Sequence, residues 1–448
     1  MHVLTNAEKL IPLRDAASLA ESRRLAGMRM VTGTTSPSTR YERISVSPAS
    51  CSIKSEYVIA SHAFKSQYKC INYIPTWEQR KLGDVAPLQR GFDLPVNQMT
   101  PGPYPVVMSN GIGGWHSKYM VKGPGVVTGR SGTIGSLHYI EQNFWPHNTS
   151  LWVTSFNGNE PRFIYWLYAS IGLERFGSGS GVPTLNRNDV HDLRVGFPCD
   201  VAEQRRIGTF FSRLDSLITL HQRKYDKLVV FKKSMLEKMF PKDGESVPEI
   251  RFAGFTDPWE QRKLGDVASS FDYGLNAAAT EYDGQNKYLR ITDIDDETHE
   301  FSKSDLTTPL ADLAMSADYL LKEGDLLFAR TGASVGKTYL YRQFDGMVYF
   351  AGFLIRARIG EGADPEFAYQ ATLTDAYKKY VAITSQRSGQ PGVNAQEYAD
   401  YQLMLPSKTE QQQIGMTLRS LDDLITLHQR KLELLQNIKK SLLDKMFV

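Results

Sequence analysis

Apolar side chains recur at alternating steps of four and three along two stretches of the chain, residues 203–240 and 410–447. This heptad spacing is typical of a coiled-coil seam. We predict one long helix over each stretch, and at about 1.5 Å per residue each would be a rod of roughly 57 Å. The two helices either pack on each other within the chain or form a coiled coil between two chains. The positions on the pattern are Ile207, Phe211, Leu214, Ile218, His221, Tyr225 and Leu228, then Ile414, Leu418, Leu421, Ile425, His428, Leu432 and Leu435.

The two stretches are copies of one repeat. They align without a gap at an offset of 207 residues, more than half of the positions are identical, and the octad LITLHQRK occupies both 217–224 and 424–431. A shorter tag, residues 77–86, returns as residues 259–268. The chain is therefore built twice, and each half consists of a tag, a divergent middle and a helix.

Both divergent middles read as mixtures of short strands and helices. Strand-like runs punctuated by glycine and proline are followed in each middle by a helical pattern, over 161–171 and 366–380. We predict an α+β fold: two α/β domains with mostly antiparallel sheet, domain 1 (77–202) and domain 2 (241–409), separated by the long helices 203–240 and 410–448. Residues 1–76 do not repeat and are rich in Ser, Thr and Arg, so we expect a poorly ordered N-terminal extension.

Composition narrows the classes of protein that remain. No run of eighteen apolar residues and no apolar leader are present, and the three cysteines are too few and scattered for a disulfide frame or a zinc site. These features predict a cytoplasmic protein without a bound metal. The net charge is +3 but uneven: residues 1–76 and 203–240 each carry +5, whereas 241–409 carry −9. The overall charge alone gives little support for nucleic-acid binding.

Two pairs of glycine-rich loops link the middles. Residues 129–135 match 329–336, and each segment lies between two strand-like runs; residues 177–186 match 388–394 in the same way before the last strand. An arginine and a hydroxyl on a tight loop suit a phosphate or a base edge. The alternatives are a hairpin turn with a surface arginine and a flexible surface loop.

Catalytic motifs are not found in the sequence. The segment 332–338 has three residues, not four, between its first glycine and the Gly-Lys pair, so it is not a nucleotide-binding P-loop. The sequence also lacks the Asn/Asp-Pro-Pro-aromatic motif of amino-methyltransferases, an Asp/Glu-x-Lys nuclease pair and metal-ligand spacing among its histidines. We therefore expect a recognition scaffold with no catalytic residues.

The order tag, variable domain, helix, repeated once, closely resembles the specificity subunit of type I restriction-modification systems. The tags, the octads and the entries Pro198…Glu203-Gln204 and Pro406…Glu410-Gln411 carry the resemblance, which covers residues 77–448. It implies that each variable domain is a target recognition domain for one half of a bipartite, asymmetric DNA site. It also implies that the helices pack antiparallel and set the spacing.

The same resemblance implies the partners. Two modification subunits would bring S-adenosylmethionine, and restriction subunits would use ATP and Mg, so no cofactor is expected on this chain. Polar loop residues would contact double-stranded DNA, with arginine suited to guanine and Asn or Gln to adenine. The residues expected in this role are Asn110, Arg130, Ser131, Thr184, Asn186, Arg187, Arg330, Thr331, Lys337, Arg387, Gln390 and Asn394. An alternative is a coiled-coil protein adaptor with two binding domains and no DNA specificity; a fused restriction enzyme would need the missing catalytic motifs.

Overall fold

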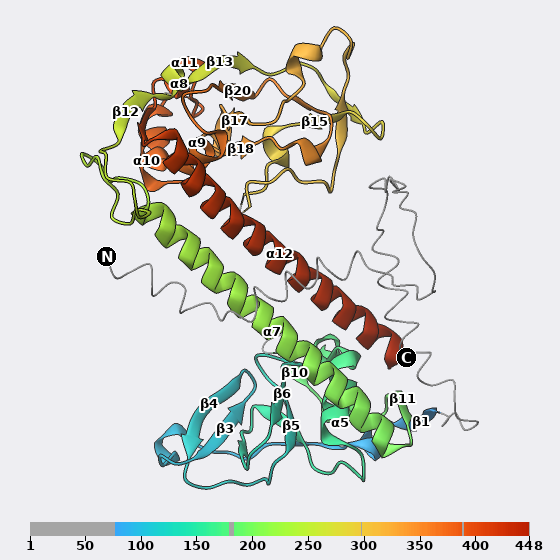
Figure 1. Cartoon of the computed structure of the whole chain (residues 1–448). Helices are drawn as coiled ribbons and strands as arrows, with labels where there is room; N and C mark the ends of the chain where they lie inside the picture. The colour runs from blue at the N-terminus through green and yellow to red at the C-terminus, as the bar shows by residue number, and fades with distance from the viewer. Residues whose placement is uncertain (1–76, 179–182, 297, 388, 448) are drawn as a thin grey trace, which may run out of the picture. The chain divides into compact units, whose positions relative to one another are not determined.

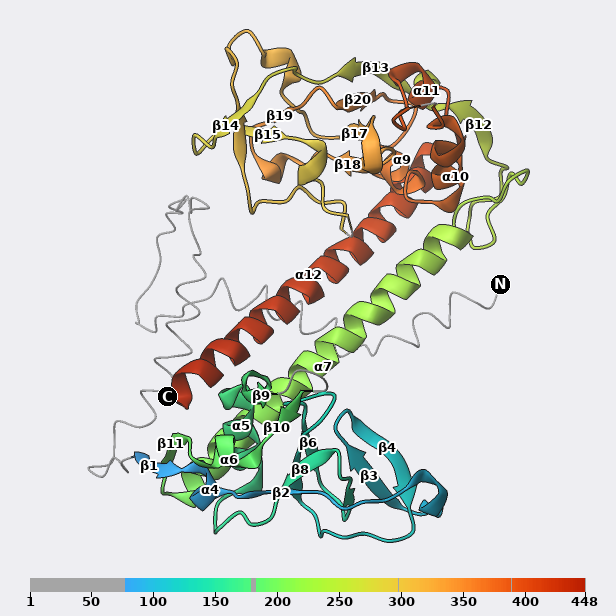
Figure 2. The ribbon, with the colours of Figure 1, turned by 180° about the vertical axis from the view of Figure 1, so that it is seen from behind.

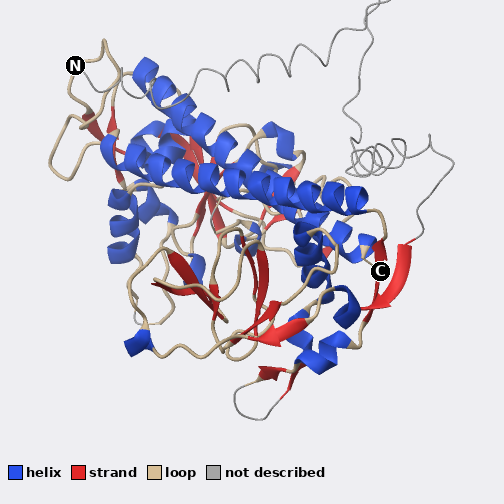
Figure 3. Cartoon of the chain, turned by 90° about the horizontal axis from the view of Figure 1, so that it is seen from below, coloured by secondary structure: helices blue, strands red, loops and turns tan. Residues whose placement is uncertain are grey.

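The computed structural model describes residues 77–178, 183–296, 298–387 and 389–447 (Figure 1). The predicted extension, residues 1–76, lies outside this part of the chain. Figure 3 shows how helices and strands alternate through the described segments. None of the described helices combines the length and the apolar character needed to span a membrane.

Domain 1 is built on a four-stranded antiparallel sheet of order β2-β8-β5-β6. Beside it lies a three-stranded sheet of order β4-β3-β7, in which β3 and β7 run parallel. The elements are β1 (Trp77–Lys81), α4 (Leu82–Val85), β2 (Leu88–Arg90), β3 (Tyr104–Met108), β4 (Gly111–His116), β5 (Gly125–Gly129), β6 (Leu137–Ile140), β7 (Trp145–Pro146), β8 (Ser150–Val153), α5 (Pro161–Ile171), β9 (Gly177–Ser178), β10 (Thr184–Leu185), α6 (Arg187–His191) and β11 (Arg194–Pro198).

Domain 2 repeats this plan with insertions. Its central sheet has the order β13-β20-β17-β18, and β15 pairs parallel with β19. The predicted α+β fold with mostly antiparallel sheet is confirmed. The elements are β12 (Glu260–Lys263), α8 (Leu264–Val267), β13 (Ala268–Tyr273), β14 (Ala279–Glu281), β15 (Lys287–Leu289), β16 (Thr307–Pro309), β17 (Asp325–Ala329), β18 (Thr338–Leu340), β19 (Val348–Phe350), β20 (Leu354–Ile359), α9 (Pro365–Ala371), α10 (Asp375–Thr384), α11 (Ala395–Ala399) and β21 (Gln402–Leu405).

The prediction of one helix over 366–380 is wrong, because the chain breaks between α9 and α10. The Thr372 hydroxyl donates to the Tyr369 carbonyl (2.6 Å) and the Thr374 hydroxyl to the Ala371 carbonyl (2.7 Å). The Thr374 oxygen also accepts a bond from the Tyr377 amide (3.4 Å) and so caps α10. Hydroxyls that bond to nearby backbone compete with the regular helix ladder, which explains the break.

Each repeated tag fastens a domain to its long helix. The tag forms a strand and a one-turn helix; β1 pairs antiparallel with β11, and β12 with β21. Strand β11 leads into α7 (Val201–Lys238) and β21 into α12 (Lys408–Met446), which start two residues before the predicted positions. The tag therefore recurs because it holds the strand from which the repeated helix starts.

Helices α7 and α12 run antiparallel along each other, as Figures 1 and 2 show from opposite sides. Residues near the start of one helix contact residues near the end of the other. Asp215 pairs with Lys439 (2.6 Å), and the Nδ1 atoms of His221 and His428 lie 2.8 Å apart, so these two repeated histidines mark the crossing. The intramolecular alternative is therefore the one that the structure adopts.

The apolar stripe of each helix also packs into the core of one domain. Ile207, Phe211 and Leu214 are buried in the core of domain 1, and Ile414 and Leu418 in the core of domain 2. These residues, predicted to lie on a coiled-coil seam, therefore also pack against the domains. Periodicity identifies the buried face of a helix, but it does not say which neighbour covers that face.

The far end of each helix docks on the other half. Phe240, just after α7, packs against Trp259 (6.0 Å between ring centroids) and Phe367 (5.2 Å) of domain 2. In the same way Phe447, just after α12, packs against Trp77 (6.3 Å) and Phe163 (5.6 Å) of domain 1. Each helix is thus attached to both domains, so its length fixes their separation.

Candidate nucleic-acid interface

The two predicted loops of domain 1 meet at Arg130, the residue that follows the central strand β5. The Arg130 amide donates to the Thr149 carbonyl (2.9 Å), and the Arg130 carbonyl accepts a bond from the Leu185 amide (2.8 Å). Ser131 and Thr184 form an isolated antiparallel bridge next to it. The backbone of Arg130 is therefore held from both sides, while its side chain remains partly exposed.

Domain 2 repeats this arrangement at Arg330, which follows β17. The Arg330 amide donates to the Phe353 carbonyl (3.0 Å), and its carbonyl accepts a bond from the Val393 amide (2.9 Å). Thr331 forms the corresponding bridge with Gly392. The two arginines thus occupy equivalent places in the two domains.

Both predicted asparagines after these loops cap short helices. The Asn186 side-chain oxygen accepts a bond from the Asn188 amide (3.1 Å) at the start of α6, and the Asn394 oxygen accepts one from the Glu397 amide (2.9 Å) at the start of α11. Arg187 follows its cap directly and is exposed. Capping uses the side-chain oxygen of each asparagine, so the amide N–H groups are the donors suited to a ligand.

Lys337 and Arg387 are already engaged by the protein. The Lys337 side chain is only 13% exposed; its Nζ donates to the Ile294 carbonyl (3.0 Å) and pairs with Asp296 (2.5 Å). Arg387 donates to the Thr384 carbonyl (2.8 Å) and forms an ion pair with Glu397. Lys337 is therefore poorly placed for DNA, because an insertion specific to domain 2 covers it.

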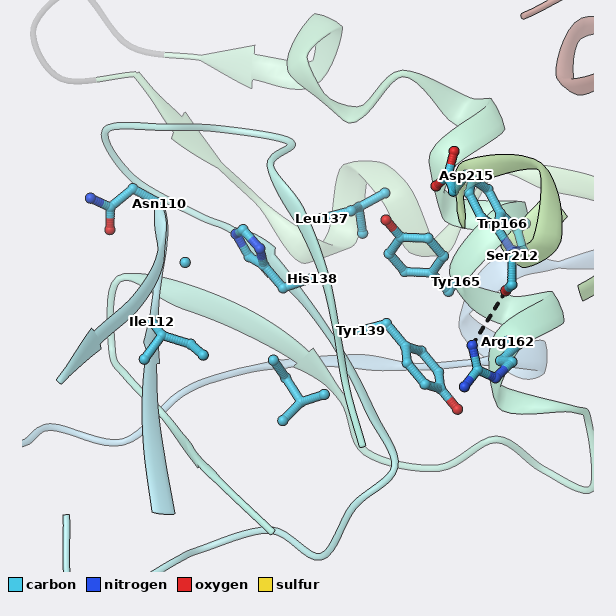
Figure 4. A pocket seen from close by; sticks show the side chains of 12 residues that line it. Asn110, Ile112, Leu137, His138, Tyr139, Arg162, Tyr165, Trp166, Ser212 and Asp215 are labelled. Carbon is cyan, nitrogen blue, oxygen red and sulfur yellow. Dashed lines mark hydrogen bonds between the residues drawn. The ribbon is translucent and has the colours of Figure 1, made fainter. Parts of the chain in front are cut away.

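The last two predicted residues, Asn110 and Gln390, are exposed. Asn110 lies in the turn between β3 and β4 and borders a cavity of about 650 Å³ in domain 1 (Figure 4). Burial lowers the pKa of His138 in this cavity below its usual value, which favours the neutral imidazole. Gln390 belongs to the loop that packs against Thr331.

Two aromatic residues at the domain 2 loops were not predicted from the sequence. The Arg330 guanidinium lies 5.0 Å from the ring centroid of Tyr273, and Tyr273 and Phe353 are 44% and 57% exposed. They line a cavity of about 610 Å³ with Arg330. An exposed ring beside a stacked guanidinium is suited to planar groups such as nucleobases. A single aromatic residue at a strand end carries no pattern that would single it out.

In domain 1 the strand positions equivalent to Tyr273 and Phe353 hold Arg90 and Thr149. The equivalence follows from the pairing of β2 with β8 and of β13 with β20. The residues that follow Arg90 and Tyr273 are also equivalent, because Gly91 lies close to the backbone of His147 just after β7, and Gly274 lies close to the backbone of Ala351 just after β19. One framework therefore presents two different surfaces.

The repeated Glu-Gln entry joins each domain to its helix. Gln204 is fully buried; its side chain accepts a bond from the Glu160 amide (2.9 Å) and donates to the Pro198 carbonyl (2.8 Å). Gln411 accepts the equivalent bond from the Asp364 amide (2.8 Å). These glutamines therefore fix the orientation of the recognition surface relative to the helix. Among the described residues, no group of three or more His, Cys, Asp or Glu is arranged to hold a metal ion.

Comparisons with known proteins agree with this architecture. The family model of the type I restriction modification DNA specificity domain matches residues 75–229 and 256–437. The specificity subunit of the type I restriction enzyme MjaVIII from Methanocaldococcus jannaschii is 22% identical over 284 residues, 59% of this chain and 64% of that relative, so the match spans less than two thirds of the relative. A crystal structure of a type I restriction-modification S subunit from M. genitalium shares the fold, with a TM-score of 0.58 and 17% identity over 85% of this chain and 98% of that one. The chain belongs to the family of the type I restriction modification DNA specificity domain.

Proposed function

We propose that this chain is the DNA sequence-recognition subunit of a type I restriction-modification complex. Domain 1 reads one half of a bipartite, asymmetric site and domain 2 reads the other half. The observation that carries this proposal is the equivalent placement of Arg130 and Arg330 on two domains with different surrounding side chains. Two different surfaces on one framework account for an asymmetric site.

The long helices set the distance between the half-sites. Each is attached to both domains, and a rod of roughly 57 Å corresponds to about 1.7 turns of DNA at about 34 Å per turn. Because both domains belong to one chain, binding of the first half-site raises the effective concentration for the second. Two modest contacts therefore combine into a tight and specific one.

Catalysis belongs to partner subunits in this proposal. Two modification subunits, with S-adenosylmethionine, methylate the site, and restriction subunits, with ATP and Mg, cleave DNA; this chain directs both in the cytoplasm. A protein adaptor without DNA specificity does not agree with the family to which the chain belongs.

Mapping of methylated bases tests the function. A host that expresses this chain with its modification subunit is compared with the same host lacking only this chain. We expect one bipartite motif that disappears on deletion. Methylation that persists unchanged without the chain would refute the recognition role.

A further inference from the structure

The repeated octad carries a threonine and an arginine one helical turn apart, and in the second half this pair binds a carboxylate. The Thr426 hydroxyl donates to Glu300 (3.3 Å), and the Arg430 guanidinium forms an ion pair with the same side chain (3.1 Å). Glu300 belongs to the insertion of domain 2, whereas Thr426 and Arg430 belong to α12. A segment of the chain thus covers this face of the second helix.

The neighbours of Glu300 fasten the segment to the edge of the domain 2 sheet. His299 Nδ1 lies 3.1 Å from the carbonyl oxygen of Thr338 on β18, the last strand of the sheet. Phe301 is 6% exposed and packs edge-on against Tyr339 of the same strand, with 6.4 Å between centroids. The acidic residue of the segment therefore reaches α12, while the aromatic residue that follows anchors the segment in the core on the sheet face that carries Tyr339.

The first half has a groove between β6 and α7 without this segment. Thr219 and Arg223 of α7 are the exact sequence counterparts of Thr426 and Arg430 at the offset of 207 residues, and both are exposed. Within the part of the chain that the structure describes, neither side chain has a hydrogen-bond or ion-pair partner. Strand β6, like β18, is the last strand of its sheet.

An open cavity of about 650 Å³ lies beside this pair, between β6, α5 and α7. Figure 4 shows Tyr139, Tyr165 and Arg162 around it, with Arg162 bonded to Ser212 of α7 (3.3 Å). Asp215, which also lines the cavity, lies one helical turn, about 6 Å, before Thr219. The aromatic cavity and the Thr–Arg pair are therefore neighbours along one helix.

We propose that this groove of domain 1 binds an acidic–aromatic peptide segment of a partner protein. A carboxylate of the segment pairs with Thr219 and Arg223, and the following aromatic side chain enters the cavity at His138, the residue of β6 that corresponds to Tyr339 of β18. The edge of β6 offers backbone groups to an extended segment, a common mode of peptide recognition. The proposal concerns a protein contact and holds whether or not the loop arginines read DNA.

Charge distinguishes the partner segment from other occupants. Residues 203–240 carry +5, which favours an acidic ligand, whereas residues 1–76 also carry +5 and do not complement Arg223. A second copy would have to withdraw its own Glu300 segment from the groove that holds it. A DNA phosphate is the other anion that could bind Thr219 and Arg223. The experiment below distinguishes binding of a phosphate from binding of a peptide.

The probe is a fluorescein-labelled peptide with the sequence of residues 294–303, titrated by fluorescence anisotropy into the full-length chain. We expect saturable binding that falls at least about fivefold in Arg223→Glu, because the reversed charge repels the carboxylate. The control is Arg213→Glu, which makes the same change of charge at another exposed residue of the same helix. The affinity of this variant for the peptide should stay within about twofold of that of the unchanged chain. A peptide with Phe301→Ala should bind at least about tenfold more weakly.

Two results would overturn the proposal. One is equal affinity of the peptide for Arg223→Glu and Arg213→Glu, which would place the peptide elsewhere. The other is full displacement of the peptide by double-stranded DNA of unrelated sequence, together with weaker DNA binding in Arg223→Glu only, which would assign the pair to a phosphate. Loss of a methylation motif in Arg130→Ala is a separate readout, so failure here leaves DNA recognition untouched.

Discussion

The joint between domain 1 and α7 depends on one buried glutamine, and we predict that Gln204→Ala destabilises this joint strongly. The side chain accepts a bond from the Glu160 amide and donates to the Pro198 carbonyl and to Asn159 Oδ1, with lengths of 2.9, 2.8 and 2.8 Å. The residue is fully buried, so water does not replace these partners when the side chain is removed. Each buried group left without a partner costs about 1–3 kcal/mol.

Two such groups, the Glu160 amide and the Pro198 carbonyl, give a loss of about 4 kcal/mol of unfolding free energy at the middle of that range. For a unit of 150–250 residues this lowers the midpoint of thermal unfolding by about 8–16 °C. Differential scanning calorimetry of the full chain measures the change. We expect the transition that contains domain 1 to move, with the domain 2 transition much less affected.

Gln222→Ala is the matched control, because Gln222 lies on the same helix, is exposed and, among the described residues, bonds through its side chain only to Asp226 (2.9 Å). Its removal should change the unfolding free energy by less than about 0.5 kcal/mol. Gln411→Ala should reproduce the large effect in domain 2. A Gln204→Ala shift no larger than that of Gln222→Ala would refute the claim that this side chain holds the joint.

Three further predictions concern recognition and the helix pair. Arg130→Ala should weaken DNA binding and relax one half-site only; unchanged affinity and unchanged methylation pattern would remove Arg130 from the interface. Tyr273→Ala should relax the other half-site, because the ring supports Arg330, and a methylome with both half-sites intact would contradict this. Burial and neighbouring lysines hold the pKa of His221 below its usual value, so the unfolded chain binds a proton that the folded chain does not. The free energy of unfolding should therefore fall as the pH falls below about 6.5. This dependence on pH should be weaker in a His221→Leu/His428→Leu variant, and urea unfolding at several pH values measures it.

The sequence predicted the repeated parts well because their residues carry local, periodic signals. The heptads placed both long helices to within about two residues; in the structure the side chains of Asp200 and Ser407 cap their first turns. The tags were recognised as repeats, but their pairing with β11 and β21 was not predicted. Strand partners far apart in sequence leave no periodic trace in either segment.

The candidate interface was predicted only in part. The loops of Arg130 and Arg330 were identified, since each follows a strand and matches its copy, yet their contact with the second loop is tertiary. Lys337 was named as a polar residue of the loop, and the insertion that buries it has no counterpart in domain 1. Phe353 and Tyr273 escaped notice because exposure of a single ring depends on packing that the sequence does not display.

The most direct test of the central claim lengthens both helices. One heptad is inserted after Gln222 and one after Gln429, next to the His221–His428 crossing, so that the seam register is kept. Seven residues add about 10 Å to each helix, or about 3 base pairs at about 3.4 Å each. The methylome of a host with this variant should contain the same two half-sites with a gap longer by about 3 base pairs. The same half-sites at the original gap would contradict the account, because the helices would then not determine the distance between the domains.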